Sequence, residues 1–145
     1  MADGDQRLGP LADTSAWTTR RRDPEVSRAF GELVEQGCIA TCGPVKLEIL
    51  RTARDANEFA AIREELDALT DVPTGEDVWR RAADVFEALA RRGPLHHRQV
   101  ALPDLVIAAA AEVAGLELLH YDRHFELIAE ITGQPVRALA PLGSL

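Results

Sequence analysis

Amphipathic segments longer than ten residues alternate with short apolar runs along this chain. Apolar residues recur every three or four positions in the longer segments, which is the spacing of a helix with one buried face. This pattern predicts helices over 24–36, 59–69, 78–89 and 123–132. A further helix should run from Gly43-Pro44 to about residue 54, since proline is tolerated in a first turn.

The short apolar runs predict strands over 8–12, 38–41, 116–119 and 135–139, with a brief fifth strand near 71–73. A helix beginning at Pro103 is apolar almost all round, so we expect it to be buried. Residues 95–102 read as a polar loop. Strands that alternate with helices indicate βαβ units, so we expect an α/β fold with a central, mainly parallel sheet of four to five strands flanked by helices.

The length of 145 residues suits one domain spanning 1–145. No apolar run approaches the roughly 20 residues that a membrane span needs. The polar, acidic N-terminus also lacks the build of a signal peptide, so we expect a cytoplasmic protein without membrane association. The only cysteines, Cys38 and Cys42, are too few for a four-cysteine zinc site, and we expect small buried thiols.

Four acidic residues occupy positions where this fold could place its chemistry. Asp13 and Asp122 follow predicted strands, at the strand ends where open parallel sheets bind ligands. Asp104 begins the buried helix, and Glu48 lies in the helix after Gly43-Pro44. Each has a structural alternative: a helix cap for Asp13, a favourable helix dipole for Asp104, solvent exposure for Glu48 and a turn for Asp122.

As a group, the four acids indicate a divalent metal. Clustered carboxylates repel one another unless a cation joins them, and oxygen-only ligands suit Mg²⁺ or Mn²⁺. Such an ion can activate a water and clamp the oxygens of a phosphodiester. The sequence has neither a GxxxxGK[ST] nor a GxGxxG motif. Ser15 stands where a dehalogenase-type phosphatase would need a second Asp.

Four segments, taken in order, resemble PIN domains, and specifically the VapC-type ribonuclease toxins of bacterial toxin–antitoxin pairs. They are Ala-Asp-Thr-Ser-Ala-Trp at 12–17, Lys-Leu-Glu-Ile-Leu at 46–50, Leu-Pro-Asp-Leu-Val-Ile-Ala-Ala-Ala-Ala at 102–111 and His-Tyr-Asp-Arg-His-Phe-Glu-Leu-Ile-Ala at 120–129. The resemblance covers nearly the whole chain. No single motif is specific, but their order and spacing together agree with the family.

The resemblance implies a PIN-like three-layer fold and Mg²⁺- or Mn²⁺-dependent RNA cleavage. It also implies a homodimer that is inhibited by a small cognate antitoxin protein. The metal-binding and catalytic acids would be Asp13, Glu48, Asp104 and Asp122. Thr14 and Ser15 stand where such proteins often place a hydroxyl near the metal.

His124 departs from the family's pattern, because relatives often carry an acid two residues after the last Asp. It could supply a ligand, touch a phosphate, or be an exposed histidine at a helix start. Our hypothesis is an endoribonuclease that hydrolyses RNA phosphodiesters with a metal-activated water held by the four carboxylates. The alternatives are a PIN-like protein-binding module with a weakened site, and a metal-dependent DNA nuclease or phosphatase.

The net charge of −8 does not exclude a nucleic-acid substrate. Fifteen of the sixteen basic residues are arginines, and several of them cluster. The clusters at 20–22 and 91–98 could contact RNA phosphates, or could form a solvated charged surface.

Overall fold

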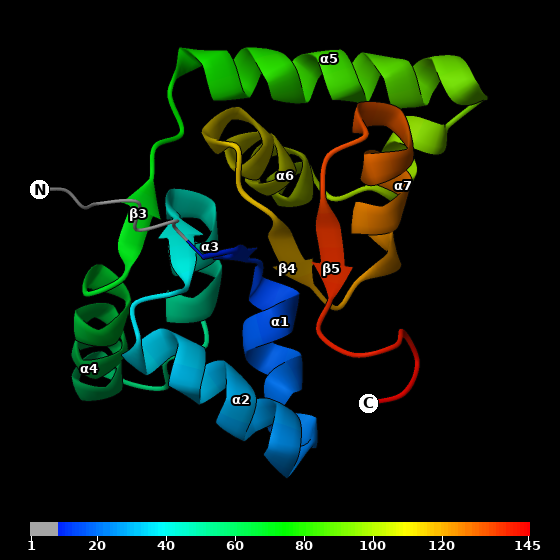
Figure 1. Cartoon of the computed structure of the whole chain (residues 1–145). Helices are drawn as coiled ribbons and strands as arrows, with labels where there is room; N and C mark the ends of the chain where they lie inside the picture. Colours follow the sequence, from blue (N-terminus) through cyan, green and yellow to red (C-terminus); the bar gives the residue numbers. More distant parts are fainter. Residues whose placement is uncertain (1–8) are drawn as a thin grey trace, which may run out of the picture.

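A five-stranded parallel sheet forms the centre of the computed structural model, which describes residues 9–145 (Figure 1). The strands are β1 (Leu11–Ala12), β2 (Ala40–Cys42), β3 (Thr70–Val72), β4 (Leu118–His120) and β5 (Val136–Ala138). They lie in the order β3-β2-β1-β4-β5, and all four neighbouring pairs are parallel. The chain leaves β1 toward β2 and later returns to its other side with β4. The strand order therefore reverses at β1, and the ends of β1 and β4 adjoin at a topological switch point.

Seven α-helices and two 3₁₀ helices connect the strands. They are α1 (Thr14–Thr19), η1 (Arg20–Arg22), α2 (Pro24–Glu35), α3 (Gly43–Leu50), α4 (Ala56–Asp67), α5 (Glu76–Arg92), η2 (His96–Gln99), α6 (Leu102–Ala114) and α7 (Arg123–Thr132). Within residues 9–145, none of these helices is both long and apolar enough to cross a bilayer.

Each face of the sheet has its own core, because successive strand residues point to opposite sides. Leu11 and Leu118 pack with buried residues of α3, α5, α6 and α7, whereas Ala12 and Leu119 pack with residues of α1 and α2. Figure 1 shows α5, α6 and α7 in the upper half of the molecule and α1 and α2 in the lower half. The α/β prediction, with a parallel sheet between helices, is confirmed.

The structure corrects several boundaries. The segment that forms α1 and η1 was not predicted to be helical, because it holds only Ala16 and Trp17 as apolar residues and so lacks a helical periodicity. The helix predicted to reach about residue 54 ends at Leu50, and the predicted polar loop contains η2. Residue 8 of the first predicted strand lies outside the described part. Cys42 is buried as predicted, but Cys38 is only partly so.

Candidate metal centre

Asp13 lies at the end of β1, where its side chain is only 2% exposed and caps α1. One of its oxygens, Oδ2, accepts hydrogen bonds from the backbone N–H of Ser15 at 2.8 Å and from the Ser15 hydroxyl at 2.5 Å. The other oxygen, Oδ1, is buried and has no hydrogen-bond partner among residues 9–145. The helix cap therefore uses one carboxylate oxygen and leaves the second one for another role.

Ser15 joins the ends of the two strands at the switch point. Its hydroxyl donates to Asp13 and accepts a hydrogen bond of 2.8 Å from the backbone N–H of Tyr121, which follows β4. Together with the backbone hydrogen bond of 2.9 Å from Asp13 N–H to Leu119, this side chain fixes the position of Asp13 relative to the segment that carries Asp122.

Glu48 reaches the same region from α3. Its Oε1 accepts a hydrogen bond of 2.7 Å from the Thr14 hydroxyl in the first turn of α1. The side chain therefore does not simply extend into solvent, which was one alternative for this residue. The hydrogen bond fixes one oxygen of Glu48 beside Asp13.

Asp122 caps α7, and its Oδ1 accepts a hydrogen bond of 2.9 Å from the backbone N–H of His124. The backbone N–H of Asp122 donates to Nδ1 of His120 at 3.1 Å. His120 is fully buried, and its Nε2 lies 3.1 Å from Oε1 of Glu126. Since Nδ1 accepts from a backbone N–H, Nε2 carries the proton and donates it to Glu126. His120 thus holds the turn that presents Asp122.

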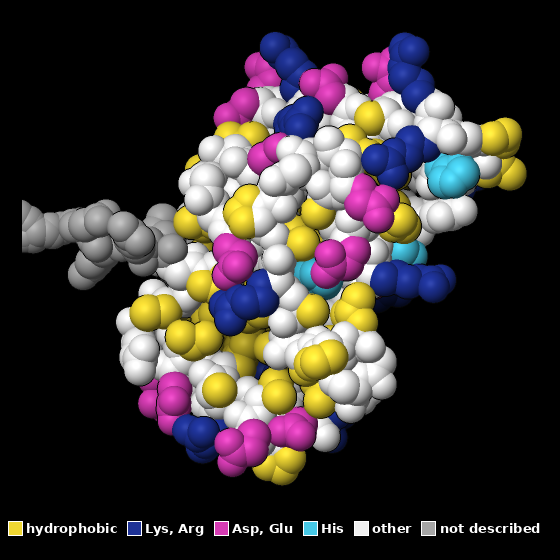
Figure 2. Space-filling view, turned by 45° about the vertical axis from the view of Figure 1, so that its right-hand side comes forward, with side chains coloured by type: hydrophobic (Ala, Val, Ile, Leu, Met, Phe, Trp, Pro, Cys, Tyr) yellow, Lys and Arg dark blue, Asp and Glu magenta, His cyan; other side chains and the backbone are white. Residues whose placement is uncertain are grey.

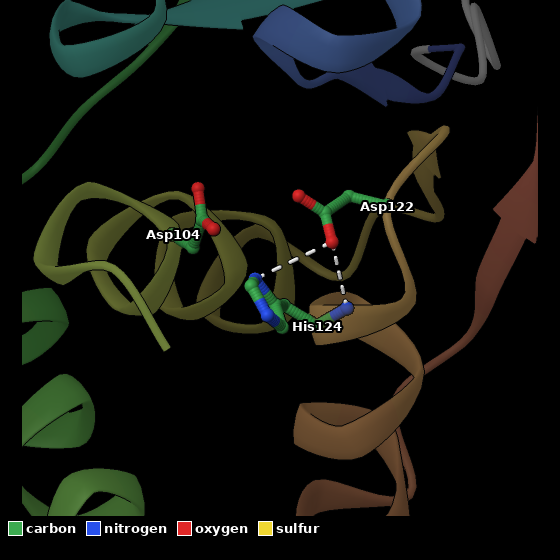
Figure 3. Close-up of side chains that lie close together, drawn as sticks. All are labelled: Asp104, Asp122 and His124. Atoms are coloured by element: carbon green, nitrogen blue, oxygen red, sulfur yellow. Dashed lines mark hydrogen bonds and ion pairs between the residues drawn. The ribbon is translucent and has the colours of Figure 1, made fainter. Parts of the chain in front are cut away.

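Asp104, Asp122 and His124 come together between α6 and the start of α7 (Figure 3). Each offers one ligand atom, and these three atoms lie within 4.8 Å of one another. Figure 3 shows the carboxylates of Asp104 and Asp122 facing one another, with the His124 ring close to both. Nδ1 of His124 lies 3.4 Å from Oδ1 of Asp122.

Burial and mutual repulsion raise the pKa values of two of these carboxyl groups. Burial, and to a smaller extent the negative charges of Asp13, Asp122 and Glu48, together raise the pKa of Asp104 to about 7. Burial also raises the pKa of Asp13 to about 6, with a smaller contribution from Glu48, although the hydrogen bonds from Ser15 oppose the rise. A divalent cation would remove this repulsion, because it stabilises every carboxylate in its ionised form.

These residues fit a hard divalent cation. The acidic site, by which we mean Asp13, Glu48, Asp104 and Asp122, presents four carboxylates. In three of them, one oxygen is fixed by a hydrogen bond from the protein. Oδ1 of Asp13 is buried without a hydrogen-bond partner in the described chain, and of the four such side-chain atoms there it is the one carboxylate oxygen, the ligand type that a hard cation prefers. A set dominated by carboxylate oxygens suits Mg²⁺ or Mn²⁺ better than Zn²⁺ or Cu²⁺.

The structure thus brings the four predicted acids to one region, together with Thr14, Ser15 and His124. Sequence reasoning did not single out His120. His120 lies at the end of an apolar strand, a position that predicts a core residue. Its partner Glu126 is six residues further along the chain, beyond the turn that follows the strand, so no periodicity of a single strand or helix predicts their contact.

Comparisons with known proteins agree with this geometry. Residues 11–131 match the model of the PIN domain family. The chain is 44% identical over 133 residues to ribonuclease VapC18 of Mycobacterium tuberculosis, covering 92% of this chain and 96% of that protein. It is 41% identical over 135 residues to ribonuclease VapC21 of the same species, with the same coverage. The chain therefore belongs to the PIN-domain family, and within it to the VapC ribonucleases.

Solved structures share the fold at low sequence identity. A DNA-bound VapBC complex from Salmonella typhimurium contains a chain that superposes with a TM-score of 0.71 at 18% identity, covering 92% of this chain and 99% of that one. VapBC2 of Rickettsia felis, bound to a promoter fragment, gives a TM-score of 0.69 at 13% identity, covering 90% and 98%.

Proposed function

We propose that this chain is a metal-dependent endoribonuclease and the toxin of a type II toxin–antitoxin pair. The observation that carries the proposal is the buried, unpartnered Oδ1 of Asp13 among three further carboxylates. Family membership supports it, because the relatives that align along almost the full chain are named ribonucleases. We further propose that residues 1–145 act as a single PIN-like domain in the cytoplasm.

The proposed cofactor is Mg²⁺ or Mn²⁺, held by the four acids of the acidic site. His124 is the proposed auxiliary ligand, since its ring nitrogen lies in the same group as Asp104 and Asp122. An imidazole nitrogen is a softer ligand than a carboxylate, so its participation would favour Mn²⁺ over Mg²⁺. The choice between the two ions is therefore a test of the role of His124.

The chain's own residues prepare the site for hydrolysis of a phosphodiester. When bound, the cation would lower the pKa of a water and stabilise the charge that develops on the phosphate oxygens. Ser15 fixes one oxygen of Asp13, and Thr14 fixes one oxygen of Glu48. The second oxygen of each carboxylate is therefore oriented before a cation binds. Asp104 is partly protonated at neutral pH, because its pKa is about 7. It would give up this proton on binding the cation, since a carboxyl group binds a metal as the carboxylate.

The direct test compares variants that keep side-chain shape but remove charge. Asp13→Asn and Asp104→Asn proteins should lose cleavage of a fluorescent RNA by roughly 100-fold or more in Mg²⁺ or Mn²⁺. Asp84→Asn, at an exposed position on α5, is the matched control and should cleave like the wild type. Undiminished, metal-dependent cleavage by Asp13→Asn protein would refute the proposal.

The alternatives predict different results in the same series. A DNA nuclease or a phosphatase would prefer a DNA oligonucleotide or a small phosphate ester over RNA. A protein-binding module with a weakened site would cleave none of the three and would show no Mn²⁺ binding by calorimetry.

We also propose a cognate antitoxin and a homodimer as partners. Leu47, Trp79 and Leu102 are 70%, 57% and 64% exposed, and they line a groove of about 560 Å³ that also includes Glu48. Apolar side chains gathered in this way are typical of a protein interface. Expression should arrest growth, and either co-expression of the antitoxin or the Asp13→Asn substitution should relieve the arrest. Sedimentation of wild-type and Trp79→Glu proteins tests the dimer, which should dissociate if this groove forms it.

A further inference from the structure

The arginines fall into two groups according to their partners. Eight arginines form ion pairs with carboxylates within residues 9–145: Arg28, Arg54, Arg63, Arg80, Arg81, Arg91, Arg92 and Arg137. Figure 2 shows this interleaving of acidic and basic side chains over α5, at the top of the molecule. Because each charge lies beside its opposite, these arginines contribute little net field at a distance.

A second group has no such partner in the described part of the chain. We call Arg21, Arg51, Arg98 and Arg123 the rim arginines. All four are exposed, and their side chains make no hydrogen bond or ion pair within the described chain from residue 9 onward. Arg20 and Arg22 belong to neither group, since the Arg20 guanidinium lies over the rings of Trp17 and Phe30, and Arg22 bonds to the main-chain oxygen of Leu145.

Each rim arginine adjoins an element that carries one residue of the acidic site. Arg21 follows α1, the helix that Asp13 caps, and Arg51 ends α3, three residues after Glu48. Arg98 lies in η2, which leads into α6 and Asp104, and Arg123 directly follows Asp122. Along the chain, the arginines without a carboxylate partner among residues 9–145 therefore adjoin the elements that carry the four acids, and Arg123 also lines a pocket with His124. Most of the paired arginines lie on α2, α4 and α5.

A groove beside the candidate metal centre contains one rim arginine, Arg123. It has a volume of about 610 Å³ and is lined by Gln99, Arg123, His124, Glu126 and Leu127. Because His124 belongs to the group with Asp104 and Asp122, the groove begins beside the acids. The one carboxylate in its lining, Glu126, is already hydrogen-bonded to the buried ring of His120.

We propose that the rim arginines bind the phosphates that flank the scissile bond, and that the strand leaves the metal centre along the groove beside Arg123. The inference rests on the proposed ribonuclease function and names how that site captures its substrate. An RNA strand is a polyanion, which a chain of net charge −8 would repel if its charges were evenly distributed. Unpaired arginines around a cation-filled acidic site create a local attraction instead, and arginine is well suited to phosphate.

The test compares two double variants of equal charge change. Arg98→Ala/Arg123→Ala removes two rim arginines, and Arg80→Ala/Arg91→Ala removes two paired arginines of α5. Binding of a fluorescein-labelled single-stranded RNA is followed by anisotropy over a range of KCl in Ca²⁺, a hard cation that carboxylate oxygens also bind, and KM and kcat are measured in Mn²⁺. Each phosphate contact contributes about 0.7 to the slope of log affinity against log salt, so the rim variant should lose about 1.4 of that slope.

We expect the KM of the rim variant to rise severalfold while kcat changes little, and the α5 variant to match the wild type. Arg98→Lys/Arg123→Lys should recover the salt slope, because it restores the charge. That recovery would show that the rim variant binds RNA weakly because it lacks charge and not because it is misfolded. Equal slopes and KM values for the two alanine variants would overturn the inference while the wild type still cleaves RNA.

Two other results would distinguish a failure of this inference from a failure of the proposed ribonuclease function. If the wild type neither binds nor cleaves RNA in the presence of Mg²⁺ or Mn²⁺, the proposed function fails, and this inference fails with it. If the rim variant keeps wild-type RNA parameters but loses affinity for an acidic antitoxin, the rim arginines serve the protein partner, and the RNA assignment is wrong.

Discussion

Replacing Asp13 with asparagine should stabilise the metal-free protein while it abolishes activity. The carboxyl group of Asp13 is almost fully buried, and burial raises its pKa from 3.8 to about 6. A carboxyl whose pKa is raised by folding contributes full stability below its unfolded pKa, and that contribution is lost as the pH rises through the folded value. The penalty therefore develops between about pH 4 and pH 6, and is complete above that range.

The size of the effect follows from the shift. A change from 3.8 to about 6 is roughly two pH units, and each unit corresponds to 1.36 kcal/mol, so the ionised side chain costs about 3 kcal/mol at most. Asparagine removes this cost, and its carbonyl oxygen can still accept the hydrogen bonds from Ser15. Its amide leaves a donor where Oδ1 lies, which offsets part of the gain. We expect a net stabilisation of about 1–2 kcal/mol, or roughly 3–6 °C in Tm.

Thermal unfolding in EDTA at a series of pH values is the assay, with Asp84→Asn as the matched control. The variant should melt above the wild type at neutral pH, and the difference should shrink as the pH falls toward 4. Adding Mn²⁺ should raise the Tm of the wild type alone, because binding at about 100 times Kd stabilises a folded protein by about 2.7 kcal/mol. A wild type that is the more stable protein in EDTA at every pH would refute the reasoning.

Three further outcomes are expected. Mn²⁺ binding should release about half a proton at pH 7, since the pKa of Asp104 is about 7 in the metal-free protein, and more at pH 6, where Asp13 is also partly protonated; calorimetry in buffers of different ionisation heat measures this number. His124→Ala should weaken Mn²⁺ roughly tenfold or more in the same titration if its ring is a ligand, and an unchanged Kd would exclude that role. Thr14→Val should release Glu48 from its hydrogen bond and lower kcat severalfold. Thr18→Val is the control and should leave kcat unchanged, because the Thr18 hydroxyl donates to main-chain oxygens of Thr14 and Ser15. Equal kcat values for the two variants would show that Glu48 needs no support from Thr14.

The sequence predicted the framework of the fold because periodicity records which side of each element is buried. The helix over 123–132 agrees with α7 at both ends, since Asp122 caps its start and Gly133 ends it. Asp13 and Asp122 could be placed in the site by topology alone, because the ends of parallel strands share one edge of the sheet. The short α1 helix could not be predicted from the sequence, because a capping residue and not a repeat of apolar positions defines it.

The interactions that hold the site could not be predicted in the same way. The hydrogen bond between Thr14 and Glu48 spans 34 residues and depends on how α1 meets α3. The pairing of arginines shows the same limit. Arg91 pairs within its helix with Glu87, a spacing that a sequence reveals, but Arg92 pairs with Glu130 on α7, which only the packing of the two helices determines. The basic cluster at 91–98 therefore divides into paired arginines and an unpaired Arg98.

The hydrogen bond between Ser15 and Tyr121 has a consequence for biosynthesis. It joins residues 106 positions apart, and β1 pairs with β4 only after residues 118–120 have been made. Chains emerge from the ribosome N-terminus first, so Asp13 and Glu48 are synthesised long before Asp104 and Asp122. The complete set of carboxylates cannot assemble on a growing chain until residue 122 has left the ribosome. For a protein proposed to cut RNA, this order of synthesis keeps the acidic site incomplete while the first 121 residues are being translated.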